Sequence, residues 1–339
     1  MPTVELSAAE ISSIQGLLQE IAENFETVEA PEFLLSAAVY AHELPRRVRA
    51  VLNEFRLKEP KEGICIIRGY PIDDDAIGDT PSHWKVRQPR SPEFKEEAFL
   101  VLLGSLLGDL IAWSTQQDGH VVHDILPIRG HEGEQLGSSS EQLLWWHTED
   151  AFHPCRGDYL GMMCLRNPTQ VPTTFASLEN VSLDLRQREL LFEPHFAIRP
   201  DESHLKKNKG NGSGLDDLLS KAYSQMESWN SEPEKISVLY GDRESPYIRI
   251  DPYFMDPVEN KEAQQALDTL IQALEGELRD VVLQPGDVVI IDNFKGVHGR
   301  KPFRAQYNGR DRWLKRINIA RDLRRSREAR RASEERIIF

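Results

Sequence analysis

Short runs of β-forming residues, separated by turns rich in proline, glycine and asparagine, follow one another from about residue 110 and constrain the fold most. Many short strands bounded by turn signals are typical of a sandwich or barrel of the jelly-roll type. A single helical pattern at residues 261–278 interrupts them. The clearest predicted strands are residues 159–165, 247–250, 288–291 after a Pro-Gly-Asp turn, and 314–320 with alternating faces.

The first 110 residues predict a mainly helical region. Ser7 and Glu10 form a capping box that opens a helix, and apolar residues then recur at helical spacing up to Phe25. Further helices are expected over residues 31–44, after Pro45 and over 91–107, with one short buried strand at 63–69. The predicted class is therefore mainly β with flanking helices (α+β), divided into a helical region 1–110, a core 111–327 and a C-terminal tail 328–339.

Two polar segments stand apart from this pattern. Residues 201–233 are rich in Gly, Ser, Asn and Lys, and a structureless stretch of that length is usually a functional lid or a disordered insert. Residues 321–336 are basic with interleaved glutamates, which favours a solvated helical or frayed C-terminus over an arm for nucleic acid.

Composition excludes several classes of partner. The 339 residues carry a net charge of -14, which disfavours binding to phosphate backbones and tilts slightly toward a small or cationic ligand. No apolar run approaches the roughly 20 residues of a membrane span, and the acidic start predicts no signal peptide. The three cysteines form no CxxC pair, so we expect reduced thiols in a cytoplasmic protein.

The sharpest local signal is His147-Thr-Glu149. On an extended segment, residues i and i+2 share a face, so an imidazole and a carboxylate can bind one metal ion. The best third ligand is His298, which follows a predicted buried strand and a turn. Two histidines and one carboxylate form the facial triad of non-haem Fe(II) oxygenases and leave coordination positions open.

Two arginines follow this histidine. Arg312 lies fourteen residues after His298, and a guanidinium there suits the far carboxylate of a dicarboxylic acid. Arg316 lies four residues on and therefore on the same strand face, although a surface ion pair is an equal alternative. Most other histidines are expected at the surface or in the core, and three are candidates for support around the metal: His120, His123 and His153.

Four stretches carry a resemblance to a known family: residues 146–159 (WHTEDAFHPCRGDY), 245–254, 284–300 and 308–327. Together they resemble the clavaminate synthase-like Fe(II)/2-oxoglutarate oxygenases, and within them the hydroxylases of free L-asparagine, L-arginine and L-lysine. The resemblance covers about residues 95–327. It implies a double-stranded β-helix (jelly-roll) core, with Fe(II), 2-oxoglutarate and O2 as cofactors and His147, Glu149 and His298 as the iron ligands.

The resemblance also implies the remaining site residues. Arg312, with Thr174, would bind 2-oxoglutarate, and no catalytic residue is expected beyond the metal ligands. The lid at 201–233 would close over the amino acid and exclude water. The implied contacts to the amino acid are Arg316 and Ser203 for its carboxylate, Gln116 or Gln117 and Glu149 for its amino group, and Asp251 with Tyr253 for its side chain.

One departure bears on the substrate. Arginine-hydroxylating relatives present two acids two residues apart where this chain has Asp251 and then Tyr253, although Asp256 could supply a second acid. We expect hydroxylation at C3 or C4 of a free basic amino acid, L-arginine or L-lysine, with 2-oxoglutarate converted to succinate and CO2. Asparagine or a carrier-bound amino acid, desaturation, a non-catalytic binding protein and a homodimer are left open.

Overall fold

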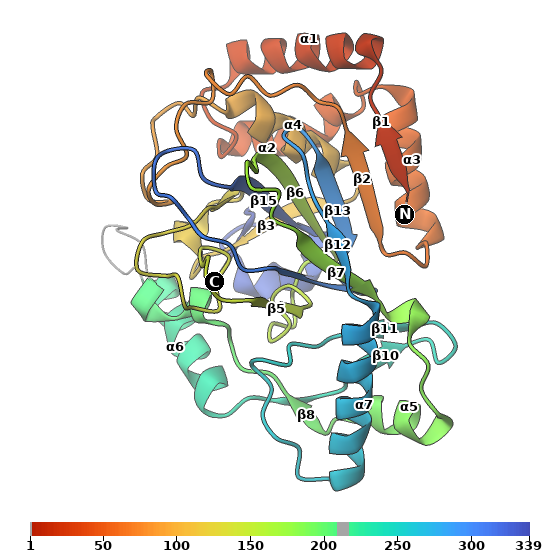
Figure 1. Cartoon of the computed structure of the whole chain (residues 1–339). Coiled ribbons are helices and arrows are strands. Elements are labelled where there is room, and N and C mark those ends of the chain that lie inside the picture. The colour runs from red at the N-terminus through yellow and green to blue at the C-terminus, as the bar shows by residue number, and fades with distance from the viewer. Residues whose placement is uncertain (1, 209–216) are drawn as a thin grey trace.

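Two β-sheets face each other in the middle of the molecule, with helices on the outside of each (Figure 1). The computed structural model describes residues 2–208 and 217–339. Apolar side chains from both sheets meet in one cluster that includes Ile66, Met162 and Val289 of the large sheet and Phe175 and Val281 of the small one. Among the described residues, no helix combines the length and the apolar character needed to cross a membrane.

The large sheet has eight strands, and β13 and β6 lie at its centre. Strands β1 and β16 pair in parallel with β2 and β3, the other neighbours are antiparallel, and β4 (His123–Ile125) pairs with β15. The order is β1 (Thr3–Glu5), β2 (Ile64–Arg68), β13 (Val288–Asp292), β6 (Tyr159–Arg166), β15 (Trp313–Ala320), β3 (Asp109–Trp113) and β16 (Ile337–Ile338).

The small sheet has four antiparallel strands. Their order is β12 (Arg279–Val281), β7 (Thr173–Ser177), β14 (Gly296–Arg300) and β5 (Leu144–His147). Two separate two-stranded ladders complete the β-structure, β8 (Phe196–Ala197) with β9 (Lys235–Ile236), and β10 (Leu239–Gly241) with β11 (Pro246–Ile248).

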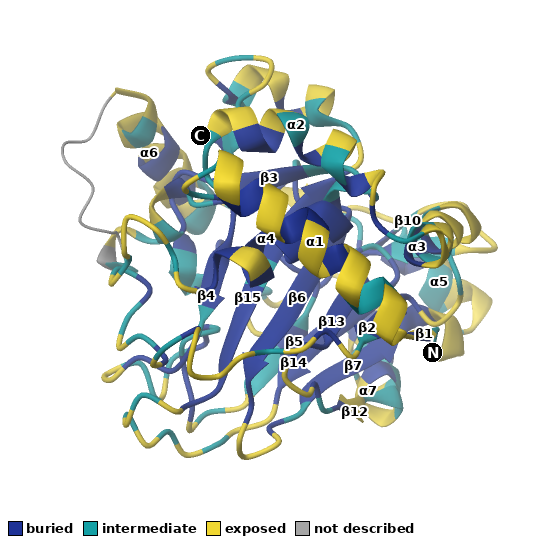
Figure 2. Ribbon diagram, turned by 90° about the horizontal axis from the view of Figure 1, so that it is seen from above, coloured by how far each residue is buried: buried dark blue, intermediate teal, exposed yellow. Residues whose placement is uncertain are grey.

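Helices from the N-terminal part cover the outer face of the large sheet. Their apolar faces share one core with Ile67, Ile290 and Ile317, and Figure 2 shows the exposed outer side of α1 above buried strands. Helices α5 (Leu185–Leu191) and α7 (Lys261–Glu277) pack instead with Trp146, Ala176 and Val297 of the small sheet. The N-terminal helices are α1 (Ala8–Asn24), α2 (Pro31–Ala41), α3 (Arg46–Lys58) and α4 (Phe94–Ser105).

The predicted helices and strands named above are present, and the capping box of Ser7 and Glu10 opens α1 as expected. The expectation of a structureless segment at 201–233 was wrong for its second half. Helix α6 (Asp217–Ser231) is built there on buried Ala222, Tyr223 and Met226, whose spacing is helical. Residues 209–216 of that segment lie outside the described residues.

The C-terminal tail is also ordered differently from the expectation of a solvated or frayed end. Arg330 is buried and donates hydrogen bonds to the backbone carbonyls of Leu323, Ala332 and Glu335. Strand β16 then pairs with β3, so the tail closes one edge of the large sheet. The backbone carbonyls therefore bind the guanidinium of Arg330, which the sequence pattern had assigned to solvent.

A buried lysine ties α4 to the large sheet. Lys315 on β15 points away from the facing sheet, and its Nζ lies 2.7 Å from Glu93, 2.8 Å from Glu97 and 2.6 Å from Asp124. All four side chains are buried, and burial raises the pKa of Glu97 to about 7. The positive charge of Lys315, which directly precedes Arg316 on β15, thus offsets three buried carboxylates.

We expect Lys315→Met to lower the free energy of unfolding by about 3–5 kcal/mol, because it leaves buried carboxylates without their cation. The loss should shrink between pH 8 and pH 5.5, because protonation neutralises Glu97, whose pKa burial raises to about 7. Urea denaturation at several pH values measures both effects. The matched control, Lys301→Met, breaks an exposed pair with Asp280 and should cost less than about 1 kcal/mol; equal effects would contradict the account.

Candidate active site

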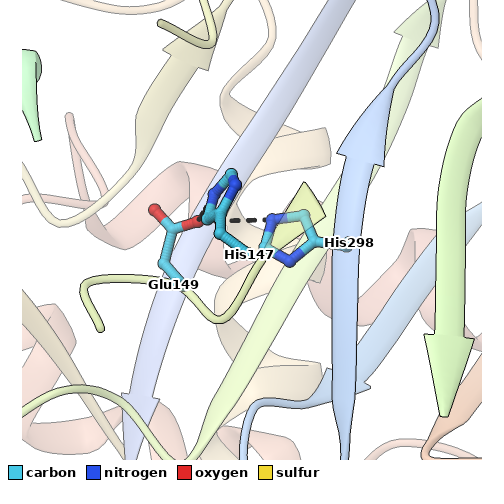
Figure 3. Close-up of side chains that lie close together, drawn as sticks. All are labelled: His147, Glu149 and His298. Atoms are coloured by element: carbon cyan, nitrogen blue, oxygen red, sulfur yellow. Dashed lines mark ion pairs between the residues drawn. The ribbon is translucent and has the colours of Figure 1, made fainter. Parts of the chain in front are cut away.

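The pairing of β5 with β14 brings two histidines face to face. His147 and His298 are direct partners in the antiparallel register, and their ring centroids are 4.8 Å apart. Glu149 follows two residues after His147, and its Oε2 lies 3.6 Å from His147 Nε2 and 3.3 Å from His298 Nε2 (Figure 3). One ligand atom from each side chain lies within 4.8 Å of the others, a grouping that could hold a metal ion.

The backbone around Glu149 is fixed on both sides. The buried side chain of Asn293, just after β13, accepts from Glu149 N at 2.7 Å and donates to its carbonyl oxygen at 3.0 Å. Thr148 N donates to the carbonyl of Ile250 at 2.9 Å. Asp150 has a φ of 50°, a left-handed conformation that aspartate tolerates better than most residues and that turns the chain directly after Glu149.

The buried charges of this cluster depend on one another. Burial alone would raise the pKa of Glu149, but the charge of Arg316 and hydrogen bonds from both histidines hold it well below its usual value. Burial would lower the pKa of His147, yet Glu149 and the charge of Asp251 outweigh it and raise that pKa to about 9. His147 Nδ1 donates to the carbonyl of Trp145 at 2.7 Å, which directs Nε2 toward Glu149.

Arg316 lies inside the site. Its guanidinium donates to Glu149, to Gln116 Oε1 at 2.9 Å and to His123 Nδ1 at 2.8 Å. The surface ion pair considered for Arg316 is therefore wrong. Gln116 reaches the site directly, whereas the side chain of Gln117, which also lines the cavity, makes both of its hydrogen bonds to the backbone of Asp124.

Arg312 is a buried cation with few partners. It is 5% exposed, it makes no ion pair with a described carboxylate, and its Nη2 donates only to Thr173 Oγ1 at 3.3 Å. Burial lowers the pKa of this arginine to about 10. Thr173 lines the cavity beside Arg312, whereas Thr174, the residue expected to help bind 2-oxoglutarate, does not line it, because neighbouring strand residues point to opposite faces.

The remaining predicted residues divide into two groups. Ser203, Asp251 and Tyr253 line the same cavity as the two arginines and the two histidines. Asp256 does not line it, because its carboxylate pairs with Arg199 at 2.7 Å. The acid beside Asp251 is instead Asp201, whose charge acts on Asp251 and whose Oδ1 accepts from Ser203 N at 2.8 Å.

Burial, with a further contribution from the charge of Asp201, raises the pKa of Asp251 to about 6, although His147 opposes this. Two acids close enough to influence each other mark this end of the cavity as a place for a positive charge. Sequence reasoning missed Asp201, Thr173 and Asn293. Only Asn293 carried a usable signal, because a polar side chain directly after a buried strand is well placed to support a site.

Comparison with known proteins gives a consistent result. Residues 49–318 match the family described as taurine catabolism dioxygenase TauD, TfdA family. The chain is 45% identical over 342 residues to enduracididine beta-hydroxylase of Streptomyces hygroscopicus, and 43% identical over 344 residues to L-ornithine/L-arginine 3-hydroxylase of Catenulispora acidiphila, each time over 100% of both chains. It also matches the crystal structure of the non-heme iron oxygenase OrfP in complex with Fe, succinate and (3S)-hydroxy-L-Arg, with a TM-score of 0.95, 44% identity and 100% coverage of both chains.

We expect His147→Ala and His298→Ala each to abolish stoichiometric Fe(II) binding, because either change removes one of three protein ligands. In the unchanged protein, Fe(II) affinity should rise with pH up to about 9, since the metal must displace the proton that Glu149 holds on His147. Anaerobic calorimetry with Fe(II) measures both effects. His195→Ala, a change away from the cavity, is the control, and Fe(II) binding by either cavity variant at wild-type affinity would remove the assignment.

Proposed function

The chain belongs to the taurine catabolism dioxygenase TauD/TfdA family, and from this premise we propose that it hydroxylates a free L-amino acid with a cationic side chain, using Fe(II), 2-oxoglutarate and O2. The relatives and the matching structure confirm the predicted resemblance to the clavaminate synthase-like amino-acid hydroxylases. The observation that carries the proposal is one cavity that combines the two histidines and Glu149 with a poorly partnered buried arginine and two acids.

The donor set fits a resident Fe(II). Two imidazoles and one carboxylate on adjacent positions are the ligands that non-haem Fe(II) oxygenases use, and they leave positions open for a second ligand and O2. We propose His147, Glu149 and His298 as these ligands. When bound, Fe(II) and 2-oxoglutarate supply the oxidising power, with 2-oxoglutarate ending as succinate and CO2.

Arg312 fits the far carboxylate of 2-oxoglutarate. A buried guanidinium without a carboxylate partner is unfavourable, and its fixed fork of donors matches a carboxylate in a bidentate geometry. Thr173 adds a hydroxyl beside it. A dianion bound between Arg312 and the metal would therefore pair one of its carboxylates with each of these two positive charges.

The other end of the cavity fits an amino acid. Arg316, held next to Gln116 and Glu149, presents a cation for an α-carboxylate, and Glu149 and Gln116 present acceptors for an α-ammonium group. Gln116 Nε2 donates to Ser203 Oγ at 2.6 Å, which places Ser203 beside the same group. Asp251 and Asp201 offer negative charge to the end of a side chain, with the hydroxyl of Tyr253 as a further contact.

The proposal also covers the carbon that is hydroxylated, the architecture of the core and the lid. We place the reaction at C3, which the names of the two relatives as beta- and 3-hydroxylases support. The facing sheets support a double-stranded β-helix core, and the cavity-lining Asp201, Ser203 and Asn208 support the predicted lid. A homodimer, a cytoplasmic location and the domain division at residue 110 stay predictions.

The function is tested by succinate formation with each free L-amino acid in turn, with Fe(II), ascorbate, O2 and 2-oxoglutarate present and product masses recorded. We expect the strongest stimulation from arginine, ornithine or lysine and a product heavier by one oxygen atom. Asp251→Asn should weaken the preference for cationic over neutral side chains, since it removes a negative charge. Stimulation by neutral amino acids alone would contradict the substrate class, and a product lighter by two hydrogens would change the reaction to desaturation.

Arg312→Met should leave thermal stability without ligands unchanged or raised, because it removes a buried cation that has no carboxylate partner. The same change should leave the rise in melting temperature with Fe(II) alone and abolish the further rise that 2-oxoglutarate adds in the wild type. Differential scanning fluorimetry measures both. Arg310→Met, which removes an exposed arginine paired with Asp74, is the control. A preserved further rise with 2-oxoglutarate in Arg312→Met would exclude Arg312 as the carboxylate partner.

A further inference from the structure

One short turn presents two side chains to the cavity and a third to the buried interior. The turn is the 3-10 helix Glu202–His204, capped by Asp201, whose carboxylate accepts from Ser203 N. Asp201 and Ser203 line the cavity, whereas His204 is absent from the lining and is only 1% exposed. The function proposed above uses the first two side chains and leaves the third, a buried titratable group, without a role.

His204 bridges two segments that carry site residues. One ring nitrogen lies 2.8 Å from Thr115 Oγ1, next to Gln116, and the other lies 3.1 Å from Asp150 Oδ1, next to Glu149. The ring is also enclosed by aromatic side chains, with the Phe152 centroid at 4.9 Å. A displacement of His204 would therefore break its hydrogen bonds to Thr115 and Asp150 and release the turn from both segments.

Asp150 is anchored independently of His204. Its Oδ2 accepts from Trp113 Nε1 at 2.6 Å and from Asn318 Nδ2 at 3.3 Å, which fixes the carboxylate to β3 and β15. Asp150, Asp201 and His204 also lie close enough to be considered as metal ligands. Hydrogen bonds within the protein already engage the Asp150 oxygens and both His204 nitrogens, so these contacts favour a structural link.

We propose that His204 is a positioning residue that locks the turn carrying Asp201 and Ser203 to the segments carrying Glu149 and Gln116. The proposal rests on the proposed function, since it assigns the turn to the amino-acid site. His204 touches no reacting atom in this scheme. It fixes the distance between the acid that faces the substrate side chain and the carboxylate that faces the metal.

A loss of this link has a defined consequence. Without His204, Thr115 and Asp150 keep buried polar atoms with fewer partners, and the turn is free to move relative to the metal ligands. A displacement of about 1 Å in a substrate-positioning group is enough to cost a large factor in productive turnover. Binding of 2-oxoglutarate should not respond, because Arg312 directly precedes β15 and Thr173 lies on β7, and neither residue is hydrogen-bonded to His204 or its turn.

The kinetic test compares His204→Ala with Thr115→Val, which removes only the hydroxyl end of the link, and with His195→Ala as the control. We expect the KM for the amino acid to rise about tenfold in His204→Ala and less in Thr115→Val, with the KM for 2-oxoglutarate within about twofold of wild type. Succinate formed per hydroxylated product should rise in both. If His204→Ala does not fold, Thr115→Val decides alone.

Wild-type amino-acid KM and coupling in the folded variants would overturn the proposal, as would equal rises in both KM values. Amide hydrogen exchange gives a readout without turnover, which separates this inference from the proposed function. We expect faster exchange at residues 203–205 in His204→Ala and unchanged exchange in β6. If no amino acid is a substrate, the proposed function fails. Unchanged exchange at residues 203–205 in His204→Ala would still, independently, overturn the positioning role of His204.

Discussion

A carboxylate held between two imidazoles and a guanidinium is the interaction on which the rest of this structure depends. Glu149 is 5% exposed, and it lies against His147, His298 and Arg316. Removing charges from water costs several kcal/mol per ion unless close partners compensate. Each of these side chains must therefore be placed accurately by its own part of the fold.

The two sheets meet that requirement, because each supplies part of the cluster around Glu149. The small sheet supplies both histidines through the direct pairing of β5 with β14, while the large sheet supplies Arg316 from β15 on its inner face. The outer faces of the same strands bury Trp146 and Val297 under α5 and α7, and Ile317 under the N-terminal helices. The short segment from His147 to Asp150 joins these parts, since Ile250, Asn293 and His204 all hydrogen-bond to it.

Much of this was predictable because alternation along a strand fixes which residues share a face. Even spacing predicted that His147 shares a face with Glu149 and Arg312 with Arg316. The structure places all four at one cavity, although Glu149 lies just beyond the end of β5 and Arg312 just before β15. The resemblance implied Thr174, one residue from the Thr173 that lines the cavity, because the sequence alone does not define which residues of β7 face the site. His204 bonds to residues more than 50 positions away, and Asp201 acts on Asp251 through its charge, so local patterns carry no information about these pairs. Helix α6 was missed because polar composition obscured the spacing of its buried residues.

The most direct test of the account is an anaerobic titration of the protein with Fe(II) and then 2-oxoglutarate, followed by visible absorption. Chelation of Fe(II) by a 2-oxo acid produces a charge-transfer band that neither component gives alone. The account predicts that this band appears with one equivalent of each, and that it shifts when L-arginine is added because the amino acid binds next to the same metal. No band, or a band that no amino acid perturbs, would contradict a shared site for iron, 2-oxoglutarate and an amino acid.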